Sequence, residues 1–178
     1  MSVLIVSTGL GSEKSKSLLL AHEADRVLRA DGTKTTLLDL RELTLPLCGT
    51  PESFTHANTL RANELVAAAN AILLATPIYN YDANAVAKNF VELTGKGWEN
   101  KVVGFLCAAG GHASRMSILA LANSLMLDFR CVIVPRFVYA TGSAFATDGS
   151  IIDADIVARV AQCARTTAKL AAAVKALA

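Results

Sequence analysis

Short, continuously apolar runs alternate with longer segments whose apolar residues recur at helical spacing, and this pattern extends along the whole chain. Strands that are apolar throughout must be covered on both faces, and the intervening helices can cover them. The alternation predicts an α/β fold: one domain, residues 1–178, with a five-stranded, doubly wound parallel sheet and helices on both faces. The predicted strands are Val3–Val6, Thr35–Leu40, Ala71–Thr76, Lys101–Ala108 and Cys131–Val134.

Proline and glycine set the expected ends of several segments. Pro77 is expected to end the third strand and Pro135 to block the fifth, because proline has no backbone N–H to donate. Gly32 is expected to stop the first helix, since glycine tolerates the left-handed conformation found at helix ends. Helices are predicted around residues 20–28, 60–69, 84–94 and 115–127, and from residue 153 onward.

The composition limits what such a sheet can bind. The chain is 53% hydrophobic and 18% charged, with a formal net charge of +2. This hydrophobicity excludes intrinsic disorder, and the lack of a basic stripe interleaved with aromatics argues against nucleic acid. The apolar runs are far shorter than the ~20 residues that span a bilayer, so no membrane partner is expected. A surplus of apolar over charged residues instead predicts self-association.

The N-terminus and the cysteines indicate a cytoplasmic protein. Met1 leads directly into the first predicted strand, without the basic segment of a signal peptide. The cysteines form no CxxC pair and show no histidine-coupled metal spacing, so no metal site is expected. We interpret them as reduced core residues. They are Cys48, Cys107, Cys131 and Cys163.

Ligands of doubly wound sheets lie beyond the carboxyl ends of the strands, so the loops there are the candidate site. The loop Ser7–Ser17 places hydroxyls, glycines and lysines at a helix N-terminus, where N–H groups and the helix dipole favour an anion. It is neither a P-loop nor a GxGxxG fingerprint. We predict a phosphate site there; the alternative is that Ser12 or Ser15 only caps the helix.

The loop after the third strand offers a flat, polar surface. Tyr79 has an aromatic face with a polar tip, and Asn80 can both donate and accept hydrogen bonds. The alternative is that Tyr79 is a core aromatic and Asn80 an ordinary turn residue.

The loop after the fourth strand is small and flexible. Gly110 and Gly111 let backbone amides approach a flat ligand closely, and such amides stabilise negative charge. The alternative is a tight strand-to-helix turn. We interpret His112 as a loop residue and expect Ser114 to cap the following helix.

In their order along the chain, these pieces resemble the NAD(P)H-dependent FMN reductases, which have a flavodoxin-like fold. The run from Ala75 to Asn89 is similar to the P-x-Y-N…K-N signature of that family. The segment Asp39–Leu43 with Leu45-Pro46, the serine-rich first loop and Gly110-Gly111 also resemble family segments.

Two regions depart from the family pattern. The family's first loop often carries an arginine two residues after its first serine, where this chain has Gly9. Tyr81, Asp82 and Asn84 replace small residues where a nicotinamide or an acceptor would approach. These departures affect substrate choice more than flavin binding.

The resemblance implies an oxidoreductase that binds FMN and passes hydride from NADH or NADPH to flavin N5. The cofactor carries the chemistry in such enzymes, so no catalytic side chain is expected. Arg115 is a candidate contact for the 2′-phosphate of NADPH, which leaves the choice of nicotinamide open. The implied FMN-binding residues are Ser7, Ser12, Lys14, Ser15, Pro77, Ile78, Tyr79, Asn80, Ala109, Gly110 and Gly111.

Two alternatives stay open at this point. One is an enzyme that keeps FMN as a prosthetic group and reduces quinones or azo compounds. The other is a non-catalytic FMN-binding electron-transfer module, although true flavodoxins are usually very acidic and this chain is +2. The resemblance also implies small-molecule substrates, a dimer or tetramer, and a flavin-dependent monooxygenase as a partner that uses the reduced flavin.

Overall fold

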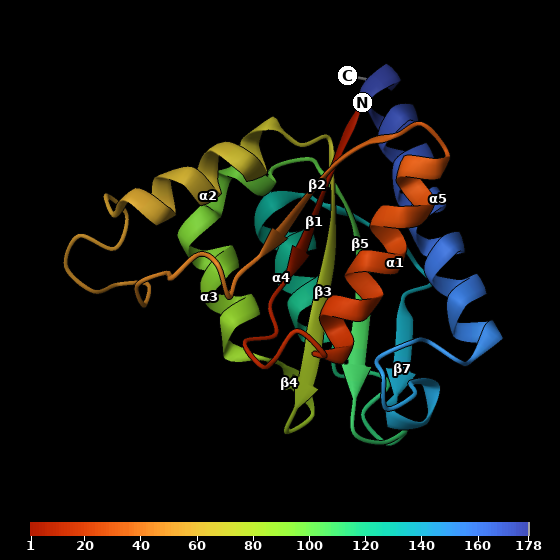
Figure 1. The fold of residues 1–178 in the computed structure, drawn as a ribbon. Coiled ribbons are helices and arrows are strands. Elements are labelled where there is room, and N and C mark those ends of the chain that lie inside the picture. Colours follow the sequence, from red (N-terminus) through yellow and green to blue (C-terminus); the bar gives the residue numbers. More distant parts are fainter. Residues whose placement is uncertain (178) are drawn as a thin grey trace.

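The computed structural model of the protein describes residues 1–177 and is built on a central sheet with the strand order β2-β1-β3-β5-β6 (Figure 1). The strands of this order are paired in parallel, so the predicted doubly wound parallel sheet is confirmed. The strands are β1 (Ser2–Ser7), β2 (Lys34–Asp39), β3 (Ala71–Tyr79), β4 (Asp82–Ala83), β5 (Val102–Ala109), β6 (Val132–Ile133) and β7 (Val138–Thr141).

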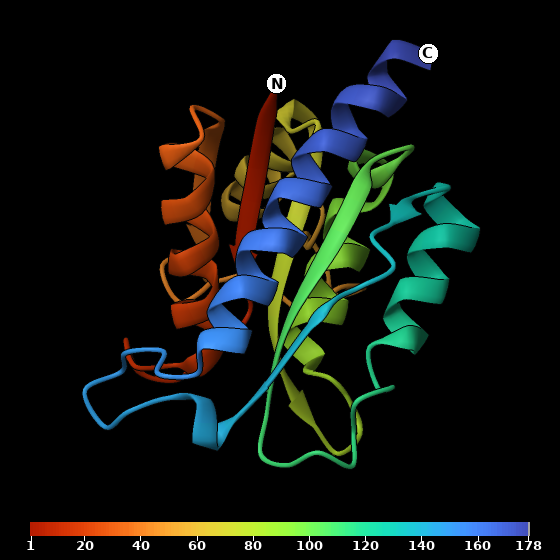
Figure 2. The same ribbon diagram turned by 90° about the vertical axis from the view of Figure 1, so that its right-hand side faces the viewer.

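Helices cover both faces of the sheet, and the two views in Figures 1 and 2 show them as separate layers. Helices α1 and α5 pack over one face, while α2, α3 and α4 pack over the other. Successive strand residues point to opposite faces, so Ile5 enters the first core and Leu4 the second. The helices are α1 (Lys16–Ala30), α2 (Ala57–Ala68), α3 (Ala85–Thr94), α4 (Leu119–Phe129) and α5 (Ala154–Leu177), with short 3₁₀ turns η1 (Gly95–Trp98) and η2 (Gly142–Ala144).

The prediction that Pro77 ends the third strand is wrong, because β3 continues through it to Tyr79. Pairing with β1 stops at Ala75, so one edge of β3 is free of that neighbour at the proline. The carbonyl of Pro77 accepts from the Asn84 N–H at 3.1 Å, which places the ring nitrogen at the same edge. The missing N–H therefore removes no bond to β5.

The fifth strand differs from the prediction in its extent. Pro135 does interrupt it, leaving only β6 within the predicted range. The chain then resumes the same edge of β5 as β7, where Val138 pairs with Leu106 and Thr141 with Ala109. Pro135 interrupts the hydrogen bonds to β5, but the edge of β5 beyond this point is still unpaired, and β7 pairs with it.

Helix α4 begins four residues later than predicted, at Leu119 instead of Arg115. The residue at its N-cap is Ile118, so the prediction that Ser114 caps it is wrong. The Ser114 hydroxyl lies instead 2.5 Å from the Tyr139 hydroxyl on β7. Within residues 1–177, no helix combines the length and the apolar character that crossing a bilayer needs.

Candidate active site

A cavity of about 750 Å³ opens at the carboxyl ends of β1, β3 and β5, where the strand order reverses. This size is typical of cofactor sites, and the position is where doubly wound sheets bind ligands. The lining residues come from the loop before α1, the end of β3 and the end of β5: Gly11, Lys14, Ser15, Lys16, Ser17, Pro77, Ile78, Tyr79, Asn80, Ala108, Ala109 and Gly110.

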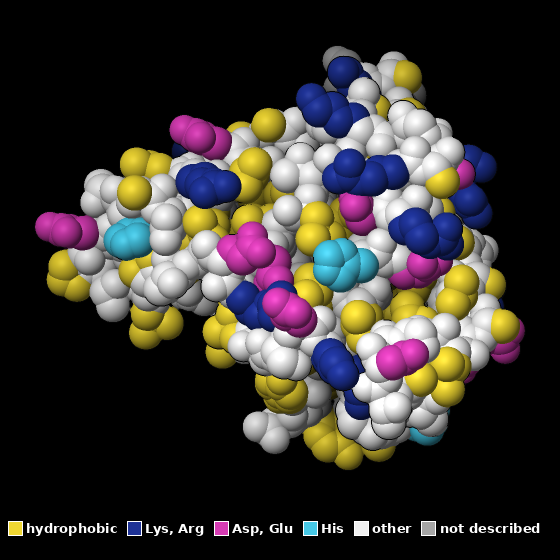
Figure 3. All heavy atoms as spheres, in the orientation of Figure 1, with side chains coloured by type: hydrophobic (Ala, Val, Ile, Leu, Met, Phe, Trp, Pro, Cys, Tyr) yellow, Lys and Arg dark blue, Asp and Glu magenta, His cyan; other side chains and the backbone are white. Residues whose placement is uncertain are grey.

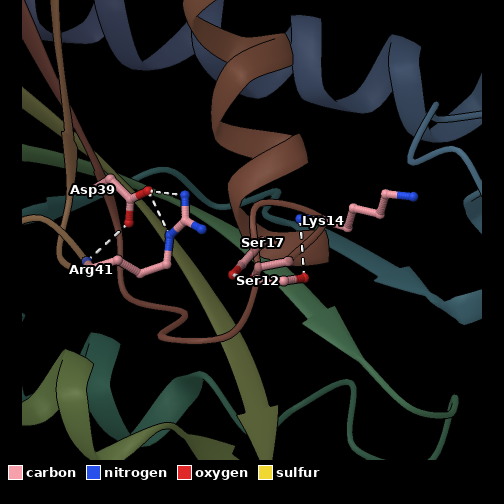
Figure 4. A network of polar contacts seen from close by, with 6 residues as sticks. Ser12, Lys14, Ser17, Asp39 and Arg41 are labelled. Atoms are coloured by element: carbon pink, nitrogen blue, oxygen red, sulfur yellow. Dashed lines mark hydrogen bonds and ion pairs between the residues drawn. The ribbon is translucent and has the colours of Figure 1, made fainter.

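One end of the cavity is the N-terminus of α1. Ser15 is the N-cap residue, but its side chain makes no capping hydrogen bond. Its hydroxyl lies 3.1 Å from the hydroxyl of Ser17, which is buried. Figure 4 shows Ser17 at the start of this helix. The backbone N–H groups in the first helical turn have no partner within the helix. This end of the cavity therefore gathers hydroxyl and amide donors. The N-cap side chain accepts no hydrogen bond from the amides.

Gly9 makes this arrangement possible. A Cβ atom at this position would lie 2.5 Å from the Ser15 hydroxyl and 2.6 Å from that of Ser17. Both distances are far below van der Waals contact, so any side chain here would push the hydroxyls aside. An arginine at position 9, as in the family pattern, would require the Ser15 and Ser17 hydroxyls to take other positions.

The two lysines of the loop lie differently. The Lys14 ammonium is directed toward the Thr147 carbonyl at 3.4 Å, on the far side of α1 from Asp39 in Figure 4. The Lys16 ammonium lies 5.9 Å from the centre of the Phe145 ring, beside Gly142. Both lysines line the cavity, and they supply its positive charge near the helix N-terminus.

Arg41, on the loop after β2, is paired with Asp39 and does not line the cavity. Arg41 donates to Asp39 through Nη2 at 2.6 Å and Nε at 2.8 Å (Figure 4). The hydrogen bond to this carboxylate raises the pKa of the Arg41 guanidinium. Asp39 takes up the arginine's charge, so the positive side chains that line this end of the cavity are Lys14 and Lys16.

The opposite end of the cavity is a β-hairpin formed by β3 and β4. Tyr79 pairs with Asp82 across it, and the Tyr79 side chain is 62% exposed. The alternative that Tyr79 is a core aromatic is therefore wrong. The hairpin contributes Tyr79 and Asn80 to the lining of the cavity.

The third wall is the end of β5 and the loop that follows. A Cβ atom added at Gly110 or Gly111 would meet nothing within 4 Å, so the backbone there is open to a ligand. The loop is anchored because the Tyr139 hydroxyl donates to the Gly111 carbonyl at 2.6 Å. The Arg115 guanidinium lies 3.2 Å from Nδ1 of His112 and 6.0 Å from the centre of the Tyr139 ring.

A buried polar network under the cavity joins its walls. The side-chain oxygen of Asn84 accepts from the hydroxyls of Thr8 at 2.8 Å and Thr76 at 3.1 Å, and from the Ala87 N–H at 3.1 Å. The Asn84 amide donates to the Thr8 carbonyl at 2.7 Å. One side chain thus caps α3 and holds the ends of β1 and β3 together.

Most of the predicted FMN-binding residues meet in this cavity. Those that line it are Lys14, Ser15, Pro77, Ile78, Tyr79, Asn80, Ala109 and Gly110. Three do not: Ser7 is fully buried with an unpartnered hydroxyl, Ser12 is exposed and accepts from the Lys14 N–H, and Gly111 follows the last lining residue, Gly110. Four further residues line the cavity and were not among the predicted FMN-binding residues: Gly11, Lys16, Ser17 and Ala108. The position of Lys16 and Ser17 at the start of the first helix could have identified these two.

The cysteines take no part in this cavity. Cys107, Cys131 and Cys163 are buried, as predicted, while Cys48 is half-buried. Burial raises the pKa of the Cys131 thiol to about 11 and that of Cys163 to about 11, and it also raises the pKa of Cys107. Such thiols stay protonated at neutral pH and are poor nucleophiles.

Residues 1–146 match the protein family described as NADPH-dependent FMN reductase. The chain belongs to this family. A curated relative, the NAD(P)H-dependent FAD/FMN reductase of Geobacillus thermodenitrificans, is 28% identical over 130 residues, which are 72% of this chain and 70% of the relative. The predicted family resemblance is confirmed.

Solved structures show the same fold. An apo NADH:FMN oxidoreductase aligns with a TM-score of 0.76 at 16% identity, over 93% of this chain and 87% of its own. The flavoenzyme NAD(P)H:(acceptor) oxidoreductase of Paracoccus denitrificans aligns with a TM-score of 0.71 at 18% identity, over 93% of this chain and 98% of its own. An oxidoreductase of Corynebacterium diphtheriae aligns with a TM-score of 0.74 at 19% identity, over 97% of both chains. The predicted flavodoxin-like fold is thereby confirmed.

Family membership settles the class of reaction. The protein is an NAD(P)H-dependent flavin oxidoreductase that uses FMN with NAD(P)H, as the sequence analysis predicted.

Proposed function

We propose that this single domain, an FMN reductase, holds FMN in the 750 Å³ cavity, with the phosphate at the N-terminus of α1 and the isoalloxazine between the hairpin and the loop after β5. The observation that carries the proposal is the polarity of this one cavity. It has hydroxyl and amide donors at one end and an exposed aromatic with open glycine backbone at the other. FMN has the same asymmetry, a dianionic tail and a flat ring system.

The residues present fit FMN in their chemistry. The hydroxyls of Ser15 and Ser17, the first amides of α1 and the lysine ammonium groups would hold the phosphate. Asn80 would bind the ribityl chain or ring edge through its donor and acceptor atoms. The amides of the Ala109–Gly111 loop would stabilise the negative charge that reduced flavin gathers near N1 and C2.

Bound FMN supplies the acceptor for hydride from NAD(P)H and the donor of electrons to a second substrate. The protein then needs to position two flat rings rather than to move a proton through a side chain. His112 fits this division, since it contacts Arg115 on the exposed loop and does not line the cavity. The chain's contribution is orientation by the hairpin, the glycine loop and the helix N-terminus.

The test is the visible spectrum of the purified protein, followed by NAD(P)H oxidation with and without added FMN. The protein is expected to bind FMN with much higher affinity than riboflavin, because only FMN has the phosphate. A Gly9→Ala variant should lose this preference, since its Cβ displaces the Ser15 and Ser17 hydroxyls. Equal affinity for the two flavins in the parent protein would refute the phosphate assignment.

Activity that requires added FMN identifies FMN as a substrate. A yellow protein that is active without added FMN identifies FMN as a prosthetic group.

We also propose that the protein forms a dimer or tetramer. Several large apolar side chains on and just before α4 stay exposed in the single chain, although Leu121 and Leu125 already fill the face toward the sheet. They are Met116, Leu119, Met126 and Leu127. Apolar surface of this kind usually meets another subunit. Sedimentation should show an oligomer at micromolar concentration, and a monomer would contradict the proposal.

We further propose that the protein works in the cytoplasm and that, where reduced FMN is released as its product, a flavin-dependent monooxygenase uses this reduced flavin. Free thiols at all four cysteines suit a reducing compartment. Cell fractionation tests the location. Coupled turnover of a monooxygenase with only NAD(P)H, FMN and this protein tests the partner, and dependence on direct contact would appear as loss of coupling across a dialysis membrane.

A further inference from the structure

The turn between β3 and β4 has an unusual residue at its tip. Tyr79 pairs with Asp82, so only Asn80 and Tyr81 connect the two strands. Their φ angles are +50° and +64°, which is the left-handed conformation at both central positions of a type I′ turn. Asn-Gly is the preferred pair for such a turn, because asparagine and glycine tolerate positive φ. Tyrosine in the second position is disfavoured.

The packing of the chain does not account for this tyrosine. Its side chain is 68% exposed. The aromatic and cation–π contacts found within residues 1–177 involve Phe90, Trp98, Phe145 and Tyr139 rings, none of them partnered by Tyr81. Glycine would give an easier turn at no loss of packing. Disfavoured backbone conformations that packing does not explain are concentrated at ligand sites.

The position of the turn points to the ligand. Tyr81 directly follows Tyr79 and Asn80, both of which line the cavity proposed for FMN. The hairpin lies at the carboxyl end of the sheet, where Figure 3 shows hydrophobic side chains gathered along the lower edge of the molecule. A substrate that lies on the flavin ring would be next to this hairpin.

We propose that the ring of Tyr81 stacks against a planar, conjugated second substrate, such as a quinone, and so determines which electron acceptors this enzyme prefers. The proposal rests on the function proposed above, because it takes the flavin ring to lie at the hairpin. Exposed aromatic rings gain most from flat, conjugated partners. A compact inorganic acceptor offers no such face.

The reaction with a quinone balances without a further reagent. NAD(P)H gives up a hydride from its nicotinamide ring, and the quinone gains two electrons and two protons, one of them from solvent. The C–H bond of the nicotinamide breaks, two O–H bonds form, and the products are NAD(P)⁺ and the hydroquinone. Ferricyanide takes the same two electrons as two separate ions and makes no ring contact.

A second copy of the chain is the other possible cover for the ring. The exposed apolar side chains that suit self-association lie on and before α4, which follows a different strand. Tyr81 lies in the turn just before β4, beside Asp82, which is also exposed, and not on the surface around α4. We therefore favour the substrate.

The experiment compares Tyr81→Gly, Tyr81→Leu and Tyr81→Phe with the parent. Tyr81→Gly removes both the ring and the disfavoured conformation, Tyr81→Leu removes the ring alone, and Tyr81→Phe keeps the ring. Phe54→Ala is the matched control, since Phe54 is another exposed aromatic, at 56%, on the segment before α2 and outside the cavity lining. For each protein, the Kd for FMN is measured first, then kcat/KM for menadione and for ferricyanide at saturating NAD(P)H.

The ratio of kcat/KM for menadione to that for ferricyanide should fall about threefold to tenfold in Tyr81→Gly and Tyr81→Leu, and stay within twofold in Tyr81→Phe and Phe54→Ala. The melting temperature of Tyr81→Gly should hold or rise, because Asn-Gly suits the turn. Unchanged ratios in all variants would overturn the proposal, as would loss of oligomerisation in Tyr81→Gly. A parent protein that does not bind FMN would instead refute the proposed function, which the Kd measurement shows separately.

Discussion

Replacing Ser15 by aspartate separates a helix cap from a phosphate ligand. Aspartate caps a helix about as well as serine, and its charge interacts favourably with the N-terminal dipole. The Ser15 side chain makes no capping bond in the parent, so the change removes no cap and gives up only the contact with the Ser17 hydroxyl. The melting temperature of Ser15→Asp should therefore stay level or rise slightly, while its binding of FMN falls.

The expected loss of affinity has two parts. A hydrogen bond from the Ser15 hydroxyl to the phosphate would be worth about 1.5–3 kcal/mol, as for other bonds to charged groups. A carboxylate about 4 Å from a phosphate adds a repulsion of up to about 4 kcal/mol per charge at an effective dielectric constant near 20, less here because Ser15 is only half-buried. The sum predicts that the Kd for FMN rises about a hundredfold or more.

The assay is fluorescence quenching of FMN and riboflavin, titrated side by side with the parent and the variant. Ser12→Asp is the matched control, because it adds the same charge to the same loop at an exposed residue outside the cavity lining. It should weaken FMN binding much less than Ser15→Asp does, and riboflavin should bind all three proteins alike. If Ser15→Asp binds FMN within threefold of the parent, or loses riboflavin equally, the hydroxyl does not face the phosphate and the reasoning is wrong.

Three further predictions concern stability. Asn84→Ala should lower the free energy of unfolding by about 2–3 kcal/mol, because it leaves the buried Thr8 and Thr76 hydroxyls without their shared acceptor. Thermal melts measure this loss of stability, and a loss below about 1 kcal/mol would contradict the prediction. Gly104→Ala should lower the free energy of unfolding by about 1–3 kcal/mol, since its Cβ would lie 2.5 Å from the Thr167 hydroxyl and 2.8 Å from Leu73 Cδ2. A variant as stable as the parent in urea would show that β5 and α5 separate easily. Burial raises the pKa of Cys131 and Cys163 above the ordinary 9.0 to about 11, so the folded state keeps these protons longer than the unfolded state does. Their contribution is full below pH 9 and is lost as the pH rises toward 11, by at most about 1.4 kcal/mol per pH unit and thiol; urea melts should show a shallower decline in Cys163→Ala than in the parent.

The sequence by itself determined the layers of this fold and the edge at which its candidate site lies. Strands such as Ala71–Thr76 are apolar at every position, and only a sheet covered on both faces buries both sides of such a strand. The position of the site follows from that topology, because the loops after parallel strands meet at their carboxyl ends. Eight of the predicted residues meet in the cavity for this reason, although they come from three separate segments of the chain.

Local signals failed where a second contact outweighed them. Pro77 reads as a strand end, yet β3 continues because the proline nitrogen lies on an edge that β1 has already left. Ser114 reads as a helix cap, yet its hydroxyl is taken by Tyr139, 25 residues further along the chain. In both cases the partner that decides the outcome is distant in sequence.

The tertiary structure alone decided how the site is held. Nothing in the run around Asn84 shows that its side chain joins Thr8, 76 residues away, to Thr76. Ser7 and Ser17 are both serines of the loop that the sequence predicts, but Ser7 ends β1 with a buried hydroxyl and Ser17 lies in the first turn of α1 beside Ser15. A residue's type sets which bonds it can make, whereas the packing of β1, β3 and α1 sets which atoms come within about 3 Å of it, and hydrogen bonds form only at that range.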